Sequence, residues 1–308
     1  MRRISALIIA LLYLFDLPLL ANDGNEVAML FIVLAGIPHG ASDHVLSKLI
    51  SQKTSNRIPS KIILNYIVIS LVYFVVWIIA PFKALLIFIA ISVFHFGQEY
   101  IEHNRISSHR SLMTLLWGSF VLLFPLVYHS GETVVYIQEL TEVSINAINP
   151  GLQPYIAVGW PATIILVTLL LFQFKRISKR KAQRMMIDTT ILSFVFLTLP
   201  LIPAFAIFFI FWHSADTYQQ LFNFYRNNQV NWDVWTFVKS FVPLSLVSFA
   251  GLVFLAIWIY GYSGTFSYSW IFVFIALISM PHIFLFDYFY QHQYGEVSQE
   301  DEVVSLST

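Results

Sequence analysis

The sequence of 308 residues contains no cysteine. This absence excludes disulfide bonds, thiolate metal ligands and cysteine nucleophiles, so any metal ion must be held by His, Asp or Glu. Charged residues are also scarce, at 11% of the chain, and the positive and negative charges cancel to a net charge of zero. A chain without a basic excess lacks the electrostatic signature of nucleic-acid binding, so we expect no nucleic-acid partner.

Hydrophobic residues, by contrast, make up 58% of the chain. They gather in runs of about 17–25 residues, the length at which a helix crosses a hydrocarbon core roughly 30 Å thick. The core of a soluble domain does not need such runs. The sequence therefore predicts an all-α, polytopic transmembrane helix bundle surrounded by membrane lipid.

Ten apolar runs are present, and we expect each to form one span. They cover residues 4–21, 26–45, 61–80, 83–101, 112–129, 154–174, 185–201, 203–221, 238–259 and 269–290. The first run lacks a clear signal-peptide cleavage site, so we interpret it as a retained span. Residues 199–203, Leu-Pro-Leu-Ile-Pro, predict either a turn between the seventh and eighth spans or a kink in one helix, which would give nine spans.

The distribution of Lys and Arg predicts a cytoplasmic N-terminus and a multi-pass protein of the cell inner (plasma) membrane. In this orientation sixteen of the 17 Lys and Arg residues lie inside or at inner span ends, and only Lys83 lies outside. Joining the seventh and eighth spans would move Arg226 outside, so the positive-inside rule favours ten spans. We find no linker or repeat, and expect one transmembrane domain over residues 1–292 and a flexible acidic tail over 293–308. No sequence pattern predicts an oligomeric state.

Five of the nine histidines lie within apolar runs: His39, His44, His95, His213 and His282. Ionisable groups inside a bilayer are costly and normally face the bundle interior, which makes them candidates for function. All except His44 lie 10 to 13 residues into even-numbered spans, which all cross in one direction. This places them about 15–20 Å below the outer surface, where they could bind one metal ion. His44, five residues after His39, is the weaker candidate.

Three of these histidines are followed within three or four residues by a carboxylate, namely Asp43, Glu99 or Asp216. This spacing places each acid on the same helix face as its histidine, where it could orient the imidazole; alternatively, these acids anchor helix ends. Asp287, five residues after His282, fits poorly. Imidazole ligands suit non-haem Fe(II), although the ligand type also allows zinc. We expect no catalytic residues beyond the metal ligands.

The segments around these histidines resemble the Brp/Blh family of bacterial and archaeal membrane proteins, which includes beta-carotene 15,15'-dioxygenases. The most specific match is the Pro-His-Gly-Ala-x-Asp-His stretch from Pro38 to His44; the shorter matches are Phe94–Gly97, Trp212–Ser214 and Pro281-His282. The resemblance implies an O2-dependent dioxygenase that cleaves beta-carotene, an apolar polyene, centrally to retinal.

The resemblance also implies that Fe(2+) is held by His39, His95 and His213. The chain departs from the family pattern at Thr217, which stands where a further histidine ligand is expected. His282 or His44 would then complete the site.

Two other functions compete with this one. A histidine-based proton or metal transporter is one, because intramembrane His and Asp residues also mark ion pathways, but no inverted repeat is evident. The other is a non-catalytic accessory protein that binds a carotenoid or retinal, which the change at Thr217 would allow. Metal content distinguishes the enzyme from the accessory protein.

Overall fold

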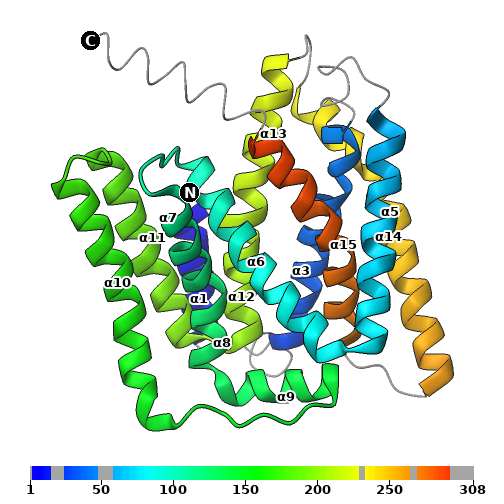
Figure 1. The fold of residues 1–308 in the computed structure, drawn as a ribbon, viewed down its shortest axis with the longest axis horizontal. Coiled ribbons are helices and arrows are strands. Elements are labelled where there is room, and N and C mark those ends of the chain that lie inside the picture. Colours follow the sequence, from blue (N-terminus) through cyan, green and yellow to red (C-terminus); the bar gives the residue numbers. More distant parts are fainter. Residues whose placement is uncertain (1, 15–23, 48–57, 229–232, 264–268, 292–308) are drawn as a thin grey trace. The chain divides into compact units, whose positions relative to one another are not determined.

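The computed structural model describes residues 2–14, 24–47, 58–228, 233–263 and 269–291 (Figure 1). These residues are helical over most of their length, and none of them forms a β-strand. The prediction of an all-α bundle is therefore confirmed. Long apolar runs favour helices because a helix satisfies its own backbone hydrogen bonds, as a membrane interior requires.

Within the described residues, each of the ten predicted spans overlaps a helix or a continuous series of helical segments. Eight are single helices: α1 (Arg2–Leu14), α3 (Gly24–Ala41), α5 (Ile58–Ile79), α6 (Pro81–His103), α10 (Gln153–Gln173), α11 (Lys179–Thr198), α14 (Val234–Ser263) and α15 (Ser269–Phe289). The fifth span combines α7 (Arg110–Gly118), η1 (Ser119–Leu123) and α8 (Phe124–Tyr128). The eighth combines α12 (Leu201–Phe208), η3 (Phe209–Ser214) and α13 (Ala215–Asn228). Two further elements, α9 (Ser130–Thr141) and η2 (Pro150–Leu152), lie between the fifth and sixth spans.

Within the described residues, seven helical stretches are long and apolar enough to cross a membrane. They are Gly24–Ser47, Pro81–His103, Arg110–Tyr128, Pro150–Gln173, Leu201–Asn227, Val234–Gly261 and Trp270–Phe289. The other three predicted spans differ: α1 has 13 residues, α5 contributes the shorter apolar stretch Leu64–Ile79, and α11 begins with three basic residues. These seven stretches indicate a membrane protein, whereas the count of ten spans and the cytoplasmic N-terminus stay predictions.

The prediction of a turn between the seventh and eighth spans is confirmed. Helix α11 ends at Thr198, and Leu199 and Pro200 have extended backbones with ψ angles of 152° and 160°. Pro200 cannot continue a helix, and it disfavours helical geometry in the residue before it. Helix α12 begins directly after it and packs against α11. The two runs therefore form two helices rather than one kinked helix.

The chain divides into two compact units that interleave along the sequence. Unit 1 comprises Met1–Gly36 and Ile89–Asn223, and unit 2 comprises Ile37–Phe88 and Phe224–Thr308. The boundaries fall within α3, α6 and α13. The prediction of one domain over residues 1–292 stays a prediction, and the predicted tail over 293–308 lies outside the described residues.

In unit 1, helices α6 and α7 cross where each carries a glycine. A Cβ atom on Gly97 would collide with the backbone oxygen of Thr114, and one on Gly118 would collide with that of Val93. Small residues at a crossing let two backbones approach closely, which is a common device in membrane proteins. One turn later on α6, Tyr100 stacks on Trp117 of α7 at a centroid distance of 3.7 Å. The crossing fixes the half of α6 that carries two candidate site residues, His95 and Glu99.

In unit 2, helix α15 packs along α5. The hydroxyl of Tyr66 lies 3.2 Å from the backbone oxygen of Ile278, and that of Ser70 lies 3.4 Å from the backbone oxygen of Leu277. These carbonyls precede Pro281, which interrupts the backbone hydrogen-bond ladder of α15. Hydroxyl groups of α5 therefore donate hydrogen bonds to α15 carbonyls next to the interruption at Pro281.

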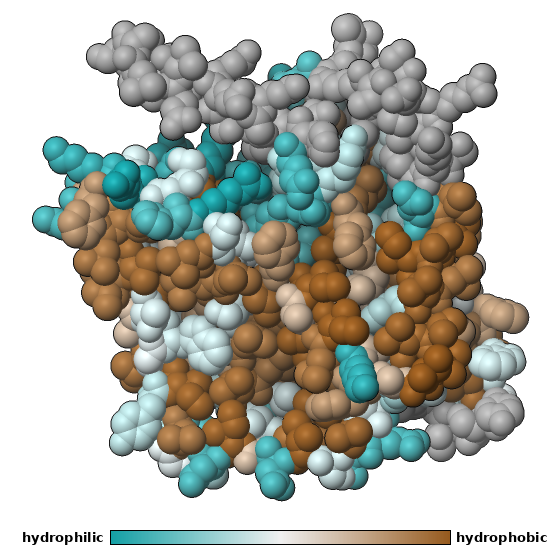
Figure 2. All heavy atoms as spheres, in the orientation of Figure 1, coloured by the Kyte–Doolittle hydropathy of each residue, from teal (hydrophilic) through white to brown (hydrophobic). Residues whose placement is uncertain are grey.

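The outward faces of both units are apolar. In unit 1, Tyr155, Val158 and Phe174 are 69–75% exposed, and in unit 2, Phe254 and Ile257 are 72% and 66% exposed. Figure 2 shows hydrophobic side chains over much of the visible surface, with hydrophilic ones gathered toward the ends of the helices. Such a surface is what helices in contact with lipid require.

Candidate functional site

Unit 2 brings His39 of α3 and His282 of α15 into contact. Their Nε2 atoms are 3.0 Å apart, and each residue is only 4% exposed. Each histidine directly follows a proline inside its helix, Pro38 or Pro281. Prolines distort a helix locally, so both imidazoles project from irregular turns.

A carboxylate holds the other nitrogen of His282. Its Nδ1 lies 2.8 and 2.9 Å from the two oxygens of Asp43, and Asp43 Oδ2 also accepts from the Tyr66 hydroxyl at 3.1 Å. An ionised carboxylate only accepts hydrogen bonds, so Nδ1 of His282 donates to Asp43, and a neutral imidazole in this tautomer has its lone pair on Nε2, the atom that faces His39. This is the arrangement seen in metal-binding histidines, whose second nitrogen donates to a carboxylate.

Unit 1 contains a similar pair, His95 of α6 and His213 of η3. Their ring centroids are 5.3 Å apart, the rings are nearly perpendicular, and both residues are 3% exposed. His213 lies in the π-helical segment Phe209–Ser214. A π-bulge inserts an extra residue into a helical turn and frequently marks a functional site. The aromatic rings of Phe96 and Phe209 lie 4.7 and 5.1 Å from the imidazole of His213.

Glu99 completes the unit 1 cluster. One of its carboxylate oxygens accepts from Nδ1 of His213, and the other accepts from the hydroxyl of Thr217. All three residues are at most 3% exposed. The same reasoning assigns the proton of His213 to Nδ1 and its lone pair to Nε2. Each unit therefore holds one imidazole by a carboxylate that also accepts from a hydroxyl.

The acids contact different partners from those that their sequence spacing predicts. Asp43 contacts His282 rather than His39. Glu99 contacts His213 rather than His95, the histidine four residues before it. An acid one turn along a helix lies about 6 Å further along the axis, where it reaches a neighbouring helix. Two of the three acids therefore contact the imidazole of a candidate ligand, in each case that of another helix, and their role as partners of metal ligands stays a prediction.

The remaining predicted residues lie apart from the two pairs. Asp216 forms an ion pair with Arg2 and lies 3.6 Å from Nε2 of His103, so it does not orient His213 as its spacing predicts. His44 is exposed, and its Nδ1 lies 2.7 Å from a backbone oxygen. Asp287 accepts a hydrogen bond from a nearby glutamine side chain at the surface.

One contributor, Tyr66, is not predicted from the sequence, where its only signal is that it is a phenol within an apolar run. Thr217 is a weaker candidate from the sequence, at a position where a histidine ligand is expected, and the structure shows its hydroxyl bound to Glu99.

Asp216 belongs to a buried charge network in unit 1 that joins α1, α6, α11 and α13. Arg3 forms two hydrogen bonds with Asp188, which also accepts from the hydroxyl of Tyr100 at 2.9 Å. Arg184 lies 3.9 Å from both Asp188 and Asp216. The Asp188 carboxylate raises the pKa of the Arg3 guanidinium above its usual value. The network anchors the N-terminal helix to unit 1.

In unit 2, the spacing of two imidazole nitrogens is compatible with two ligands of one metal ion. Two imidazole nitrogens bound to one ion at ~2.1 Å are separated by roughly 3.0–3.4 Å, which matches the distance between Nε2 of His39 and Nε2 of His282. Within either described unit, no three His, Asp or Glu side chains gather closely enough to hold an ion. The four-histidine site stays a prediction, because its two pairs belong to different units.

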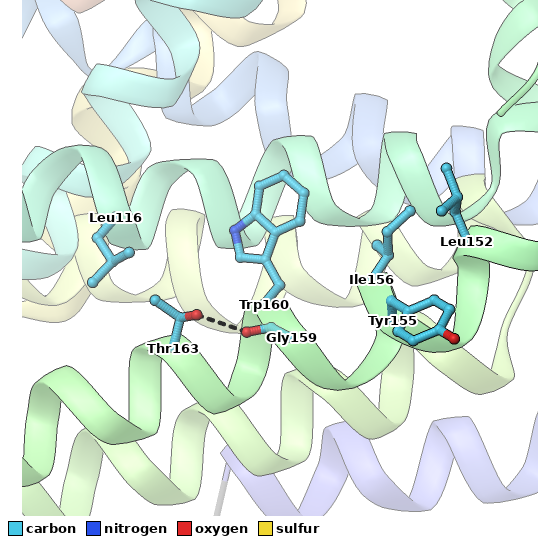
Figure 3. A pocket seen from close by; sticks show the side chains of 7 residues that line it. All are labelled: Leu116, Leu152, Tyr155, Ile156, Gly159, Trp160 and Thr163. Atoms are coloured by element: carbon cyan, nitrogen blue, oxygen red, sulfur yellow. Dashed lines mark hydrogen bonds between the residues drawn. The ribbon is translucent and has the colours of Figure 1, made fainter.

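A pocket of about 430 Å³ lies on the surface of unit 1 and contains none of these histidines. It is lined by Leu116, Leu152, Tyr155, Ile156, Gly159, Trp160 and Thr163 (Figure 3). The hydroxyl of Thr163 donates to the backbone oxygen of Gly159 at 2.7 Å. The lining is otherwise apolar apart from the Tyr155 and Trp160 polar atoms, and it contains no histidine or carboxylate.

Comparison with known proteins agrees with the resemblance seen in the sequence. A family model described as beta-carotene 15,15'-dioxygenase matches residues 30–290, a range that includes both histidine pairs. A curated relative named beta-carotene 15,15'-dioxygenase, from the uncultured marine bacterium 66A03, is 36% identical over 72 residues. That match covers 23% of this chain and 26% of the relative, so the chain aligns with about a quarter of the relative's length. No solved structure matches. The family match covers most of the chain, and this protein therefore belongs to the beta-carotene 15,15'-dioxygenase family.

Proposed function

We propose that this protein is a membrane-embedded, iron-dependent dioxygenase that cleaves beta-carotene, or a related carotenoid, at its central double bond to give retinal. The observation that carries the proposal is the buried histidine pair of unit 2, with Nε2 atoms 3.0 Å apart and Asp43 holding Nδ1 of His282. Family membership supports the carotenoid substrate. The seven long apolar helices support a multi-pass membrane location, and the assignment to the plasma membrane is part of the proposal.

We propose the histidines of both pairs as iron ligands: His39, His95, His213 and His282. Fe(2+) held by these residues would supply the redox chemistry that lets O2 react with a polyene. Asp43 and Glu99 hold the Nδ1 protons of His282 and His213, so the Nε2 lone pairs are available to the metal. The reaction balances because each of the two aldehyde groups that replace the central double bond receives one atom of O2.

Aromatic side chains give the histidine pairs an apolar surrounding. In unit 2, the ring centroid of Phe286 lies 4.5 Å from that of His282 and 6.1 Å from that of His39. In unit 1, Phe96 and Phe209 contact His213. A polyene has no polar group to orient it, so contacts with such rings are the means to position it, and they also exclude water.

The test is iron content and retinal formation by protein purified in detergent. We expect near-stoichiometric iron after anaerobic loading, and retinal when beta-carotene and O2 are added. His282→Ala and His213→Ala should each lose iron and retinal formation, because each removes an imidazole of one pair. The matched control is His109→Asn, at an exposed position with a φ of 50°, which asparagine tolerates.

The outcomes separate this proposal from its rivals. Wild-type protein that binds no iron but retains beta-carotene or retinal would indicate an accessory protein. Metal or proton uptake into vesicles, without any retinal, would indicate a transporter. Iron that survives both histidine substitutions would show that the ligands lie elsewhere.

A further inference from the structure

Both units contain the same chain of three groups: a hydroxyl, a carboxylate and an imidazole. In unit 2, the chain runs from Tyr66 through Asp43 to Nδ1 of His282. In unit 1, it runs from Thr217 through Glu99 to Nδ1 of His213. The two hydroxyls differ in type, since Tyr66 carries a phenol and Thr217 an alcohol, and they come from distant parts of the sequence. Each nevertheless donates to the carboxylate that holds a histidine.

The hydroxyl has a definite task in such a chain. A buried carboxylate is stable in its ionised form only when hydrogen-bond donors replace the water that it has lost. In unit 1 the two oxygens of Glu99 each have one donor, the imidazole and the Thr217 hydroxyl. Removing the hydroxyl would leave one oxygen without this donor. The carboxylate would then be free to rotate, and its hold on the imidazole would weaken.

Thr217 is placed to act only in this way. It follows His213 by four residues, so both side chains lie on one helix face and hold Glu99 of α6 between them. Thr217 is 1% exposed and a hydroxyl is a poor ligand for iron beside imidazoles. The residue at the position where a histidine was expected therefore supports a ligand rather than replacing one.

We propose that Thr217 and Tyr66 are positioning residues, whose hydroxyls hold Glu99 and Asp43 so that His213 and His282 present Nε2 to the metal. The effect on iron rests on the proposed function, whereas the effect on the histidine tautomers does not. Partners that hold a ligand histidine in this way are worth about 10- to 100-fold in metal affinity.

The test uses substitutions that remove only the hydroxyl. Thr217→Val keeps the side-chain shape, Thr217→Ser restores the hydroxyl, and Tyr66→Phe removes the phenol oxygen. The controls are Thr168→Val, at a buried threonine of unit 1 that bonds only within its own region of α10 and α11, and Tyr73→Phe, at a buried tyrosine of α5.

Two readouts are needed, both on full-length protein whose folding is checked by thermal unfolding. The first is nitrogen NMR of histidine-labelled, metal-free protein, which reports the tautomer of each imidazole. We expect His213 to be protonated at Nδ1 in the wild type and in Thr217→Ser, but to be a mixture of tautomers in Thr217→Val. The second is iron affinity by competition, which should fall about 10- to 100-fold in Thr217→Val and Tyr66→Phe, and recover in Thr217→Ser.

Unchanged histidine signals in Thr217→Val and Tyr66→Phe would overturn the proposal. So would an equal loss of iron affinity in Thr168→Val and Tyr73→Phe, because the effect would then be structural. If the wild type binds no iron while Thr217→Val still alters the signal of His213, the positioning role stands and the proposed function fails.

Discussion

At the scale of single residues, the histidine pairs depend on buried carboxylates that have no access to bulk water. Asp43 and Glu99 are 4% and 3% exposed, and each is stabilised by an imidazole and a hydroxyl. A buried acid that lost these donors would become protonated or move. The acids and the imidazoles are therefore interdependent, and a change in either should alter the other.

The first prediction concerns Asp43→Asn. The amide can donate as well as accept, so it no longer forces the proton of His282 onto Nδ1. We expect iron affinity to fall about 10- to 100-fold with little change in overall fold. Iron competition titrations measure the effect, and Asp287→Asn, near the surface of the same unit, is the control. Full iron affinity in Asp43→Asn would contradict the role given to the carboxylate.

At the scale of helices, the position of His95 and Glu99 depends on how closely α6 approaches α7. The contact is made backbone to backbone at Gly97 and Gly118. A side chain at either position meets main-chain atoms, which cannot rotate away. The short Phe94–Gly97 match to the family thus contains both a candidate ligand, His95, and Gly97, the residue at which α6 packs closely against α7.

We therefore predict that Gly97→Ala separates α6 from α7. The expected loss in unfolding free energy is about 1–3 kcal/mol, the usual range for an overpacked contact. Thermal or denaturant unfolding in detergent checks it. Gly251→Ala is the matched control, because a Cβ atom there meets nothing within 4 Å. Equal stability of the two variants would show that the helices have room to move apart.

The charge network attaches α1 to the rest of unit 1, and Asp188 is its most buried member. Asp188→Ala removes the acceptor for both Arg3 and Tyr100. Arg3 has a side chain 36% exposed and can regain water, so we expect a loss of about 1–3 kcal/mol rather than the larger cost of an isolated buried charge. Limited proteolysis near the N-terminus and unfolding experiments measure it, with exposed Glu142→Gln as the control. Unchanged protection of α1 would refute the anchoring role.

At the scale of the whole molecule, the topology is the main prediction that the structure leaves to experiment. Seven described helical stretches are long and apolar enough to cross a membrane, and the direction in which each crosses is predicted from the positions of Lys and Arg. The natural chain has no cysteine, so a single introduced cysteine can be labelled without background. This makes the orientation directly measurable.

We predict that Lys83→Cys in cells is labelled by a membrane-impermeant thiol reagent from outside. Arg105→Cys and Arg180→Cys should react only after the membrane is permeabilised, because the positive-inside rule places these residues in the cytoplasm. Labelling of Arg180→Cys from outside, with Lys83→Cys protected, would reverse the predicted orientation. Labelling of Arg105→Cys and Arg180→Cys on opposite sides would change the number of spans between them.

The sequence by itself determined the helical architecture, because the features that encode it are local. Apolar run length predicted where helices lie, and Pro200 marked the segment between α11 and α12 as either a turn or a kink, because proline removes a backbone donor and restricts the residue before it. The sequence also identified the buried histidines, because an ionisable residue in an apolar run is conspicuous in any fold.

Only the tertiary structure decided which groups meet. Spacing along a helix states that Glu99 shares a face with His95, but not that a neighbouring helix presents His213 and Thr217 to that face. Likewise, Asp43 meets Tyr66 of α5 and His282 of α15, two helices that pack together although they are far apart in the sequence. Helix formation depends on contacts a few residues apart, whereas the partner of a buried carboxylate depends on which helices pack together, and residues distant in sequence determine that.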